Sequence, residues 1–269
     1  MNSINYNIPN IKNQLITETF INDLFIKHDL SNTKIKDINK YILASVHKSY
    51  TINNENCLYD ISKEELQNAI PLQKENNERL EFLGDSILYS AITSYIYDRY
   101  FYKNEGFLTR LRTKLINGET LAYLAKELNF NKYILISKHI EQSNSRNNLN
   151  LLEDFFEAFI GAMFLDLGIE ITIKFLINVY EAEMDFSELI RFNTNYKDTL
   201  LKFYQEQKWQ HPKYILEENN SDSVQFNIII YDNSKNIVGK GSAPTKKKAE
   251  QLAAKNALIT FNRLYEDEL

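Results

Sequence analysis

Three carboxylates share one short stretch of the chain, NERLEFLGDSIL, at residues 77–88. Glu78, Glu81 and Asp85 stand at positions i, i+3 and i+7, so a helix would project all three from one narrow stripe. Like charges at helical spacing destabilise an isolated helix by about 0.2–0.5 kcal/mol per pair. The stripe contains no cation of its own at those spacings. We therefore expect positive charge to reach it from outside this helix.

A second pair of carboxylates lies in the apolar stretch LLEDFFEAFIGAMFLDLG. Asp154 and Glu157 stand at i and i+3 of a helix that is otherwise rich in Phe, so we expect them to be partly buried and to need a partner. Both acidic helices contain an interior glycine, Gly84 and Gly161, at a cost of about 0.5–1 kcal/mol relative to Ala. This indicates close helix approach, which would gather four carboxylates around one point: Glu81, Asp85, Asp154 and Glu157.

Four carboxylates without a neighbouring Cys or His form a hard oxygen site of the kind that Mg²⁺ or Mn²⁺ occupies. Such a cation can polarise a phosphodiester and activate water, so the pattern favours phosphodiester hydrolysis. The alternative is a structural network in which the acids pair with Arg79, Arg110 or Arg112. A single acidic pair would favour that network, whereas two pairs on glycine-containing helices favour the metal site.

The elements that must position these residues are helices. Apolar periodicity predicts helices over 77–102, 107–115, 118–129, 149–167 and 169–182, and no alternating strand pattern occurs before residue 210. A short helix is predicted in the polar loop at 62–70. Residues 1–35 are interpreted as an N-terminal extension, a helix preceded by a loose arm.

The pattern changes after a linker at 186–194. A helix, three strands and a last helix follow in fewer than 70 residues, which predicts a small α-β-β-β-α domain. Residues 195–263 contain 11 Lys and Arg against 7 Asp and Glu, a net charge of +4, whereas the rest contains 20 against 29, or −9. An acidic part and a basic part are what a metal-dependent nuclease with its own nucleic-acid-binding module would show, whereas an acidic surface alone is usually only solvated.

The composition places few further limits on function. A hydrophobic content of 43% is ample for a buried core, and one cysteine, Cys57, excludes an internal disulfide framework and indicates a reducing compartment. The first residues lack the pattern of a secretory signal, and no apolar run reaches 18 residues. We expect an intracellular protein that does not enter a membrane.

The acidic motifs resemble those of the ribonuclease III family. NERLEFLGDSIL is similar to the family signature, EDFFEAFIGAMFLDLG to its second acidic motif, and HKSY at residues 47–50 to its first-helix motif. The resemblance implies an all-α nuclease domain over 36–185, in which the catalytic, metal-binding set is Glu81, Asp85, Asp154 and Glu157 with Mg²⁺, or Mn²⁺ in its place. It also implies accessory roles for Glu78 and Glu105, and a homodimer in which Phe82 inserts into the partner subunit. About 26 residues, 51–76, separate HKSY from the signature, more than compact family members have.

Residues 195–264 resemble the double-stranded RNA-binding domain. TKKKAEQLAAKNAL is similar to its last helix, which implies that Lys246, Lys247 and Lys248 bind phosphates across the major groove of the duplex. Lys202 and Gln205, on the first helix, are expected to meet the minor groove. The loop at 219–222 lacks the Gly, Pro and His of the family, so we expect reduced duplex affinity.

Two functions follow from these resemblances. The first is a homodimeric, Mg²⁺-dependent endoribonuclease that cuts both strands of duplex RNA and leaves short 3′ overhangs. The second is a catalytically silent relative that binds duplex RNA or the ribosome. Silent relatives typically lose the acidic set, and all four carboxylates and both accessory acids are present here, so we favour the enzyme.

Overall fold

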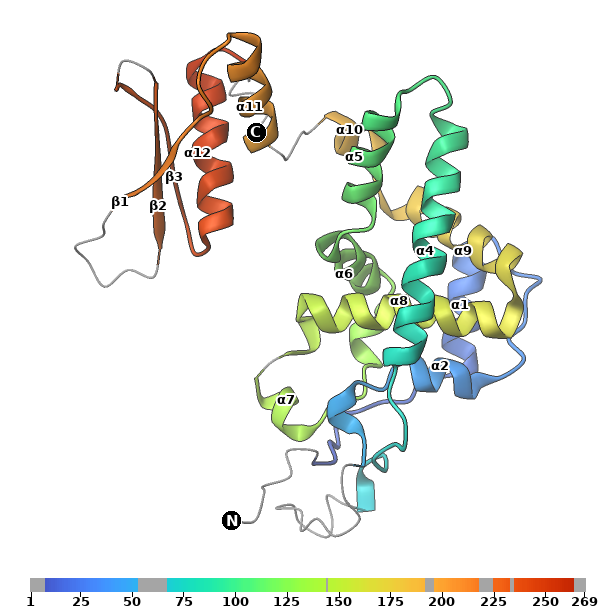
Figure 1. Ribbon diagram of the computed structural model, residues 1–269. Coiled ribbons are helices and arrows are strands. Elements are labelled where there is room, and N and C mark those ends of the chain that lie inside the picture. Colours follow the sequence, from blue (N-terminus) through green and yellow to red (C-terminus); the bar gives the residue numbers. More distant parts are fainter. Residues whose placement is uncertain are drawn as a thin grey trace, which may run out of the picture. The chain divides into compact units, whose positions relative to one another are not determined.

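A computed structural model describes residues 8–52, 67–143, 145–191, 196–217, 225–232 and 235–263 (Figure 1). The chain divides into two compact units, Met1–Asp185 and Phe186–Leu269. The predicted fold class, an all-helical unit followed by a small α-β-β-β-α unit, is confirmed. Most of the helix predicted at 62–70 and the altered loop at 219–222 lie outside the described residues.

The first unit consists of α-helices joined by short 3₁₀ turns. Its elements are α1 (Glu18–Lys27), α2 (Ile38–Ala44), η1 (Lys48–Tyr50), α4 (Glu78–Arg99), α5 (Glu105–Leu115), α6 (Gly118–Glu127), η2 (Phe130–Lys132), α7 (Lys138–Gln142), η3 (Ser145–Asn147), α8 (Leu149–Leu167) and α9 (Ile169–Glu183). All five helices predicted between residues 77 and 182 are confirmed.

Asparagine side chains mark where several of these helices begin. Asn104, Asn117 and Asn148 each have extended backbone and accept a hydrogen bond from a main-chain N–H in the first turn of α5, α6 and α8. Helix α5 therefore begins at residue 105, two residues before the predicted start. Gly168, with φ of +85°, separates α8 from α9, a conformation that glycine adopts without strain.

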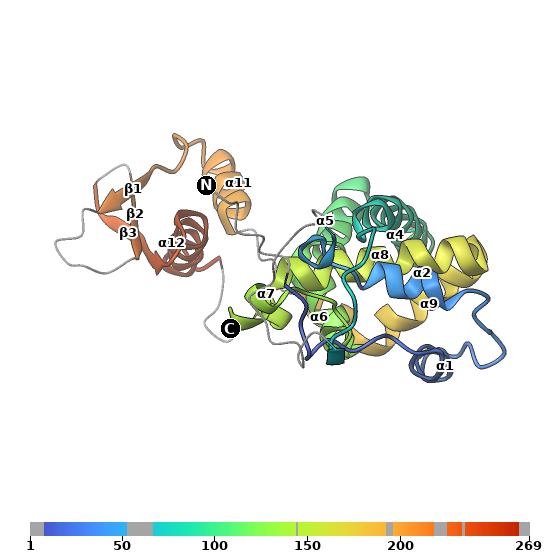
Figure 2. The same ribbon diagram turned by 90° about the horizontal axis from the view of Figure 1, so that it is seen from below.

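Helix α8 is the centre of the first unit. It packs against α2, α4, α6 and α9, so that the neighbouring helices surround it (Figure 2). Its buried phenylalanines join an aromatic cluster in which the ring of Phe130 lies 4.8 Å from that of Phe155 and 4.7 Å from that of Phe159. A rigid α8 thus provides a fixed base for the acidic residues along it.

Residues 8–17, which precede α1, are not the loose arm that their polar sequence suggests. Asn13 Nδ2 donates to the carbonyl of Ile136 at 3.0 Å, and Asn10 Nδ2 donates to Glu141 at 2.9 Å. Arg146 donates to Asn13 Oδ1 at 2.8 Å and also pairs with Glu141. Asn10 and Asn13 are buried with these bonds made, so this part of the chain belongs to the core of the unit.

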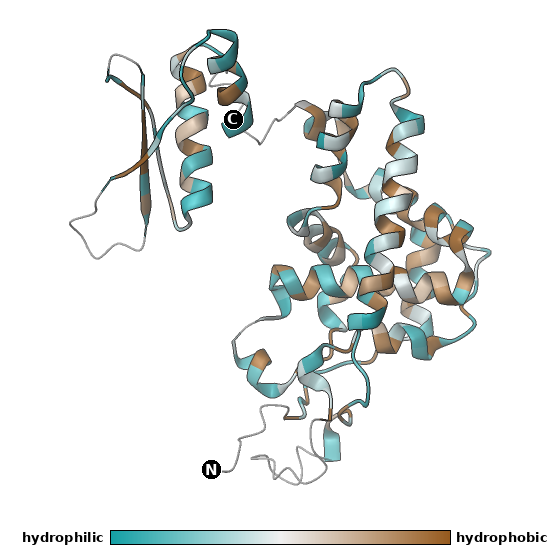
Figure 3. Cartoon of the chain, in the orientation of Figure 1, coloured by the Kyte–Doolittle hydropathy of each residue, from teal (hydrophilic) through white to brown (hydrophobic). Residues whose placement is uncertain are grey.

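The second unit contains α10 (Phe186–Arg191), α11 (Tyr196–Glu206), β1 (Tyr214–Glu217), β2 (Phe226–Tyr231), β3 (Ile237–Ala243) and α12 (Lys246–Thr260). Residues 186–191, predicted as linker, are therefore helical. The strands form an antiparallel sheet in the order β1-β2-β3. Strand β2 is mostly apolar (Figure 3), and α12 packs so closely on β3 that a Cβ on Gly239 or Gly241 would overlap the helix.

Within the described residues, no helix is long and apolar enough to cross a membrane.

Candidate active site

The acidic pair of α4 consists of Glu81 and Asp85 and lies near the beginning of this helix. The main-chain carbonyl of Asn77 accepts the N–H of Glu81 at 2.9 Å, which places Glu78 and Glu81 in the first turn of the helix. Carboxylates are favoured there by the positive end of the helix dipole. Glu81 is half-buried and Asp85, one turn later, is exposed.

Helices α4 and α8 touch through their main chains at two glycines. A Cβ added to Gly84 would overlap the carbonyl of Glu157, and one added to Gly161 would overlap the carbonyl of Leu80. The predicted close approach of the two acidic helices is thus confirmed. No side chain intervenes at the crossing, so the main chain itself fixes the spacing of the two acidic pairs.

The four predicted carboxylates interact electrostatically. Burial, followed by the charge of Asp85, raises the pKa of Glu157 to about 8. The smaller contributions to this shift come from three further carboxylates, Glu153, Glu81 and Asp154. Burial and then the charge of Asp154 raise the pKa of Glu81 to about 7. The crossing of α4 and α8 therefore brings Glu81, Asp85, Asp154 and Glu157 within electrostatic range of one another.

A cation that acts on this set comes from the HKSY motif. Lys48 Nζ lies 3.5 Å from Glu78, and its charge lowers the pKa values of Glu81 and Asp154, against the larger opposing effect of burial. Sequence reasoning expected an external positive charge but did not identify Lys48. The sequence did contain a signal for Lys48, because this residue follows His47 directly in the HKSY motif.

The alternative arginine network is absent from the described part of the chain. There, none of Glu81, Asp85, Asp154 and Glu157 forms an ion pair. Arg112 instead donates to Thr93 Oγ1 at 3.3 Å and lies over the ring of Tyr89, 4.4 Å from its centre.

A hard divalent cation fits the chemistry of this donor set. The set contains only carboxylates, two of them with strongly raised pKa values, and such a cation would offset their mutual repulsion. The side-chain rotamers do not themselves form a coordination shell. Among the described residues, no group of three or more His, Cys, Asp or Glu side chains is arranged to hold a metal ion.

The remaining predicted residues of the first unit lie on α4 and α5. Glu78 is exposed and pairs with Lys48. Glu105 begins α5 and accepts a hydrogen bond from Thr109 at 2.8 Å. The charge of Glu105 is not among the principal charges acting on Glu81 or Glu157.

Phe82, beside the acidic pair, is 78% exposed. Exposure of so large an apolar side chain marks it as a candidate contact with another molecule.

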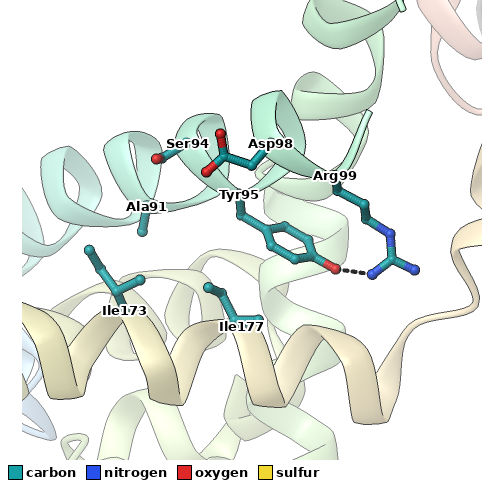
Figure 4. Close-up of a pocket in the computed structure, with 7 residues that line it drawn as sticks. All are labelled: Ala91, Ser94, Tyr95, Asp98, Arg99, Ile173 and Ile177. Carbon is teal, nitrogen blue, oxygen red and sulfur yellow. Dashed lines mark hydrogen bonds between the residues drawn. The ribbon is translucent and has the colours of Figure 1, made fainter. Parts of the chain in front are cut away.

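A pocket of ≈ 470 Å³ lies farther along α4, where this helix faces α9 (Figure 4). Its lining residues are Ala91, Ser94, Tyr95, Asp98, Arg99, Ile173 and Ile177. Arg99 donates to the hydroxyl of Tyr95 and pairs with Glu181, so local partners satisfy the polar wall. None of the predicted site residues lines this pocket.

The predicted RNA-binding lysines stand at the beginning of α12. Thr245 has extended backbone and its Oγ1 accepts the N–H of Lys248 at 3.3 Å, so the helix starts with Lys246, Lys247 and Lys248, all of them exposed. On α11, Lys202 and Gln205 are also exposed. The ammonium group of Lys202 lies 2.7 Å from Asp198, one turn before it, so this lysine is partly neutralised within its own helix.

Comparison with known proteins assigns the class of both units. The family model for Ribonuclease-III-like proteins matches residues 36–182, and that for the double-stranded RNA binding motif matches residues 196–260. The chain therefore belongs to the ribonuclease III family, and the predicted enzyme class, a ribonuclease III endonuclease with a double-stranded RNA-binding domain, is confirmed. Dependence on a divalent metal is general in this family, in agreement with the donor set.

Individual relatives show how far this likeness extends. The chain is 38% identical over 252 residues to the probable ribonuclease 3 of Acanthamoeba polyphaga mimivirus, an alignment that covers 91% of this chain and 46% of the viral protein. It is 34% identical to ribonuclease 3 of Streptococcus gordonii, covering 84% and 91% of the two chains. The nuclease domain of ribonuclease III from Campylobacter jejuni has 29% identity and a TM-score of 0.48, covering 60% of this chain and 98% of that domain.

Proposed function

We propose that this protein is a homodimeric endoribonuclease that hydrolyses phosphodiester bonds in double-stranded RNA with Mg²⁺, which Mn²⁺ can replace, and leaves short 3′ overhangs. The observation that carries the proposal is the crossing of α4 and α8 at Gly84 and Gly161, where carboxylates that pair with no cation among the described residues act on one another electrostatically. Its cation-binding residues are Glu81, Asp85, Asp154 and Glu157.

The chain's own groups have distinct tasks in this reaction. When bound, the divalent cation supplies Lewis acidity at the phosphodiester and lowers the pKa of an attacking water. The four carboxylates would hold the cation, and the main-chain contact between α4 and α8 sets the spacing of the two helices that carry them. Glu78 and Glu105, both exposed, act as accessory acids at the border of the site.

RNA binding is the task of the second unit. Lys246, Lys247 and Lys248 bind phosphates, and the positive end of the α12 dipole adds to their charge. Gln205 and Lys202 contact the minor groove. To do so, Lys202 must break its ion pair with Asp198. The duplex is recognised by its shape and its phosphates, so binding is expected to depend strongly on salt concentration.

Cleavage of both strands requires two active sites, and Phe82 supports a dimer that provides them. Its ring projects from α4 between Glu81 and Asp85, with 78% of its surface exposed. Insertion of this ring into a second copy would bury it and would place one acidic site in each subunit.

The proposal is tested by separating cleavage from binding. Glu157→Gln keeps the side-chain shape but removes a ligand charge, so it should reduce duplex cleavage at millimolar Mg²⁺ by at least about 10²-fold while duplex binding stays near the wild-type level. Replacement of Lys246, Lys247 and Lys248 by Ala should do the reverse, weakening duplex binding and flattening its salt dependence while Mg²⁺ still raises the melting temperature.

Glu170→Gln is the matched control, because Glu170 is an exposed glutamate on α9. It should change neither cleavage nor binding. A wild-type protein that binds duplex RNA but does not cut it with Mg²⁺ or Mn²⁺ would establish the silent relative instead. Near-wild-type cleavage by Glu157→Gln would remove Glu157 from the ligand set.

A further inference from the structure

A fifth carboxylate, Glu153, lies at the same helix crossing. It precedes Glu157 by four residues on α8, so the two side chains share one face of the helix. The charge of Glu153 acts on Glu157, and Glu153 in turn experiences the charges of Asp154 and Asp85. It is therefore within electrostatic range of both acidic helices.

The Glu153 carboxylate lies against Gly118, the first residue of α6. A Cβ added to Gly118 would overlap Oε2, Cδ and Oε1 of Glu153, so the carboxylate fills the space that a side chain at 118 would need. The N-terminal turn of α6, with Asn117 as its cap, thus forms the wall against which this side chain lies. Main-chain N–H groups at such a helix end favour a negative charge beside them.

No side chain neutralises this carboxylate within the described residues. Glu153 is half-buried there and forms neither an ion pair nor a hydrogen bond. A charged group would gain more hydration if it extended fully into water. A positive charge in the site beside it would compensate for this lost hydration.

We infer that Glu153 is a positioning residue of the proposed metal site, held by Gly118 and adding a fifth negative charge to the field that attracts the divalent cation. The inference rests on the proposed function. Glu153 is not one of the four ligands; it acts on the cation through space and so lowers the metal concentration that the site requires. Its removal should weaken metal binding without removing the groups that carry out hydrolysis.

The experiment measures the melting temperature of the full chain as a function of Mg²⁺ concentration, with duplex cleavage measured on the same samples. Glu153→Gln should raise the Mg²⁺ concentration for half-maximal stabilisation by about fivefold, since one charge acting on a divalent ion through partly screened solvent contributes about 1 kcal/mol. Cleavage at saturating Mg²⁺ should stay close to the wild-type rate. Glu153→Asp keeps the charge and should stay near the wild-type midpoint.

A second variant tests the same idea without altering the carboxylate. Gly118→Ala places a methyl group where the Glu153 carboxylate lies. The long side chain of Glu153 can move aside, so the fold should persist. The Mg²⁺ concentration for half-maximal stabilisation should then rise as it does in Glu153→Gln. Gly106→Ala is its control, because a Cβ there meets its nearest neighbour at an ordinary 3.4 Å. It should leave the midpoint unchanged.

Two results would overturn the inference. One is an unchanged Mg²⁺ midpoint in Glu153→Gln and Gly118→Ala, with the wild type clearly stabilised by Mg²⁺. The other is loss of cleavage by Glu153→Gln at saturating Mg²⁺, which would make Glu153 a ligand. A wild-type protein that shows neither stabilisation by Mg²⁺ nor metal-dependent cleavage would instead refute the proposed function, so the two failures are distinguishable.

Discussion

Glu157 is the residue whose protonation the site affects most. Burial and then the neighbouring carboxylates raise its pKa from 4.5 to about 8. Between these two pH values the folded chain holds a proton that the unfolded chain has released. In the metal-free protein, the stability that protonation provides is therefore complete below pH 4.5 and is lost as the pH rises through about 8.

This linkage gives a prediction for the metal-free protein. Glu157→Gln cannot ionise, so at pH 8 and above it should melt about 2–4 °C higher than the wild type, equivalent to about 1 kcal/mol after allowance for screening by solvent. The difference should shrink toward pH 4.5. Melting curves in the presence of a chelator measure it, with Glu170→Gln as control. A gap of constant size across this range would mean that Glu157 does not titrate there.

At the scale of single residues, the gathering of four carboxylates at one helix crossing could be predicted because their spacing and motifs are local in the sequence. Glu153 could not. It is an ordinary helix residue until α6 is placed against it, and its constraint comes from Gly118, 35 positions earlier in the chain. Lys48 was missed for a similar reason, since its pairing with Glu78 crosses 30 residues.

Among the elements, the crossing of α4 and α8 has the least tolerance for change. Gly161→Ala would drive a methyl group into the carbonyl of Leu80, a main-chain atom that cannot rotate away. We expect destabilisation by about 1–3 kcal/mol and a loss of metal-dependent stabilisation, because the two acidic pairs must separate. Denaturant unfolding with and without Mg²⁺ measures both effects.

Gly106→Ala is the control for this substitution, since α5 has room for the added methyl group. It should leave the free energy of unfolding unchanged or slightly increased. If Gly161→Ala retained both wild-type stability and its full response to Mg²⁺, the main-chain contact would not determine the carboxylate spacing.

Helices were the elements that the sequence predicted best, because apolar periodicity is a local signal. The glycines in α4 and α8 also predicted the crossing itself. The segment at 8–16 was misjudged, because Asn10 and Asn13 are polar in the sequence and become core residues only through partners more than 120 positions away. Polar residues that are buried by distant main-chain groups leave no periodic signal.

For the molecule as a whole, the proposed dimer depends on one exposed ring, that of Phe82. Phe82→Ala should raise the dimer dissociation constant of the full chain by roughly thirtyfold, the effect of losing a central contact of about 2 kcal/mol. Sedimentation equilibrium across a range of protein concentrations measures this change. Duplex binding by a single subunit should persist, because it depends on α11 and α12.

Phe101 provides a control of matched chemistry. It follows α4 at the opposite end from Phe82 and is 84% exposed, so Phe101→Ala removes an equally accessible ring. This variant should remain as dimeric as the wild type. Dissociation caused by Phe101→Ala but not by Phe82→Ala would move the interface to the far end of the helix.

The docking of the segment that contains Asn13 and Phe25 has a consequence for synthesis on the ribosome. Asn13 is satisfied by Ile136 and Arg146, and Phe25 of α1 packs against Phe175 of α9, with ring centres 5.9 Å apart. Asn13 therefore waits for residues more than 120 positions later in the chain, and Phe25 waits until α9 has left the exit tunnel. Closing so long a loop is slow, so the nascent chain is expected to depend on protection from proteases and aggregation during that interval.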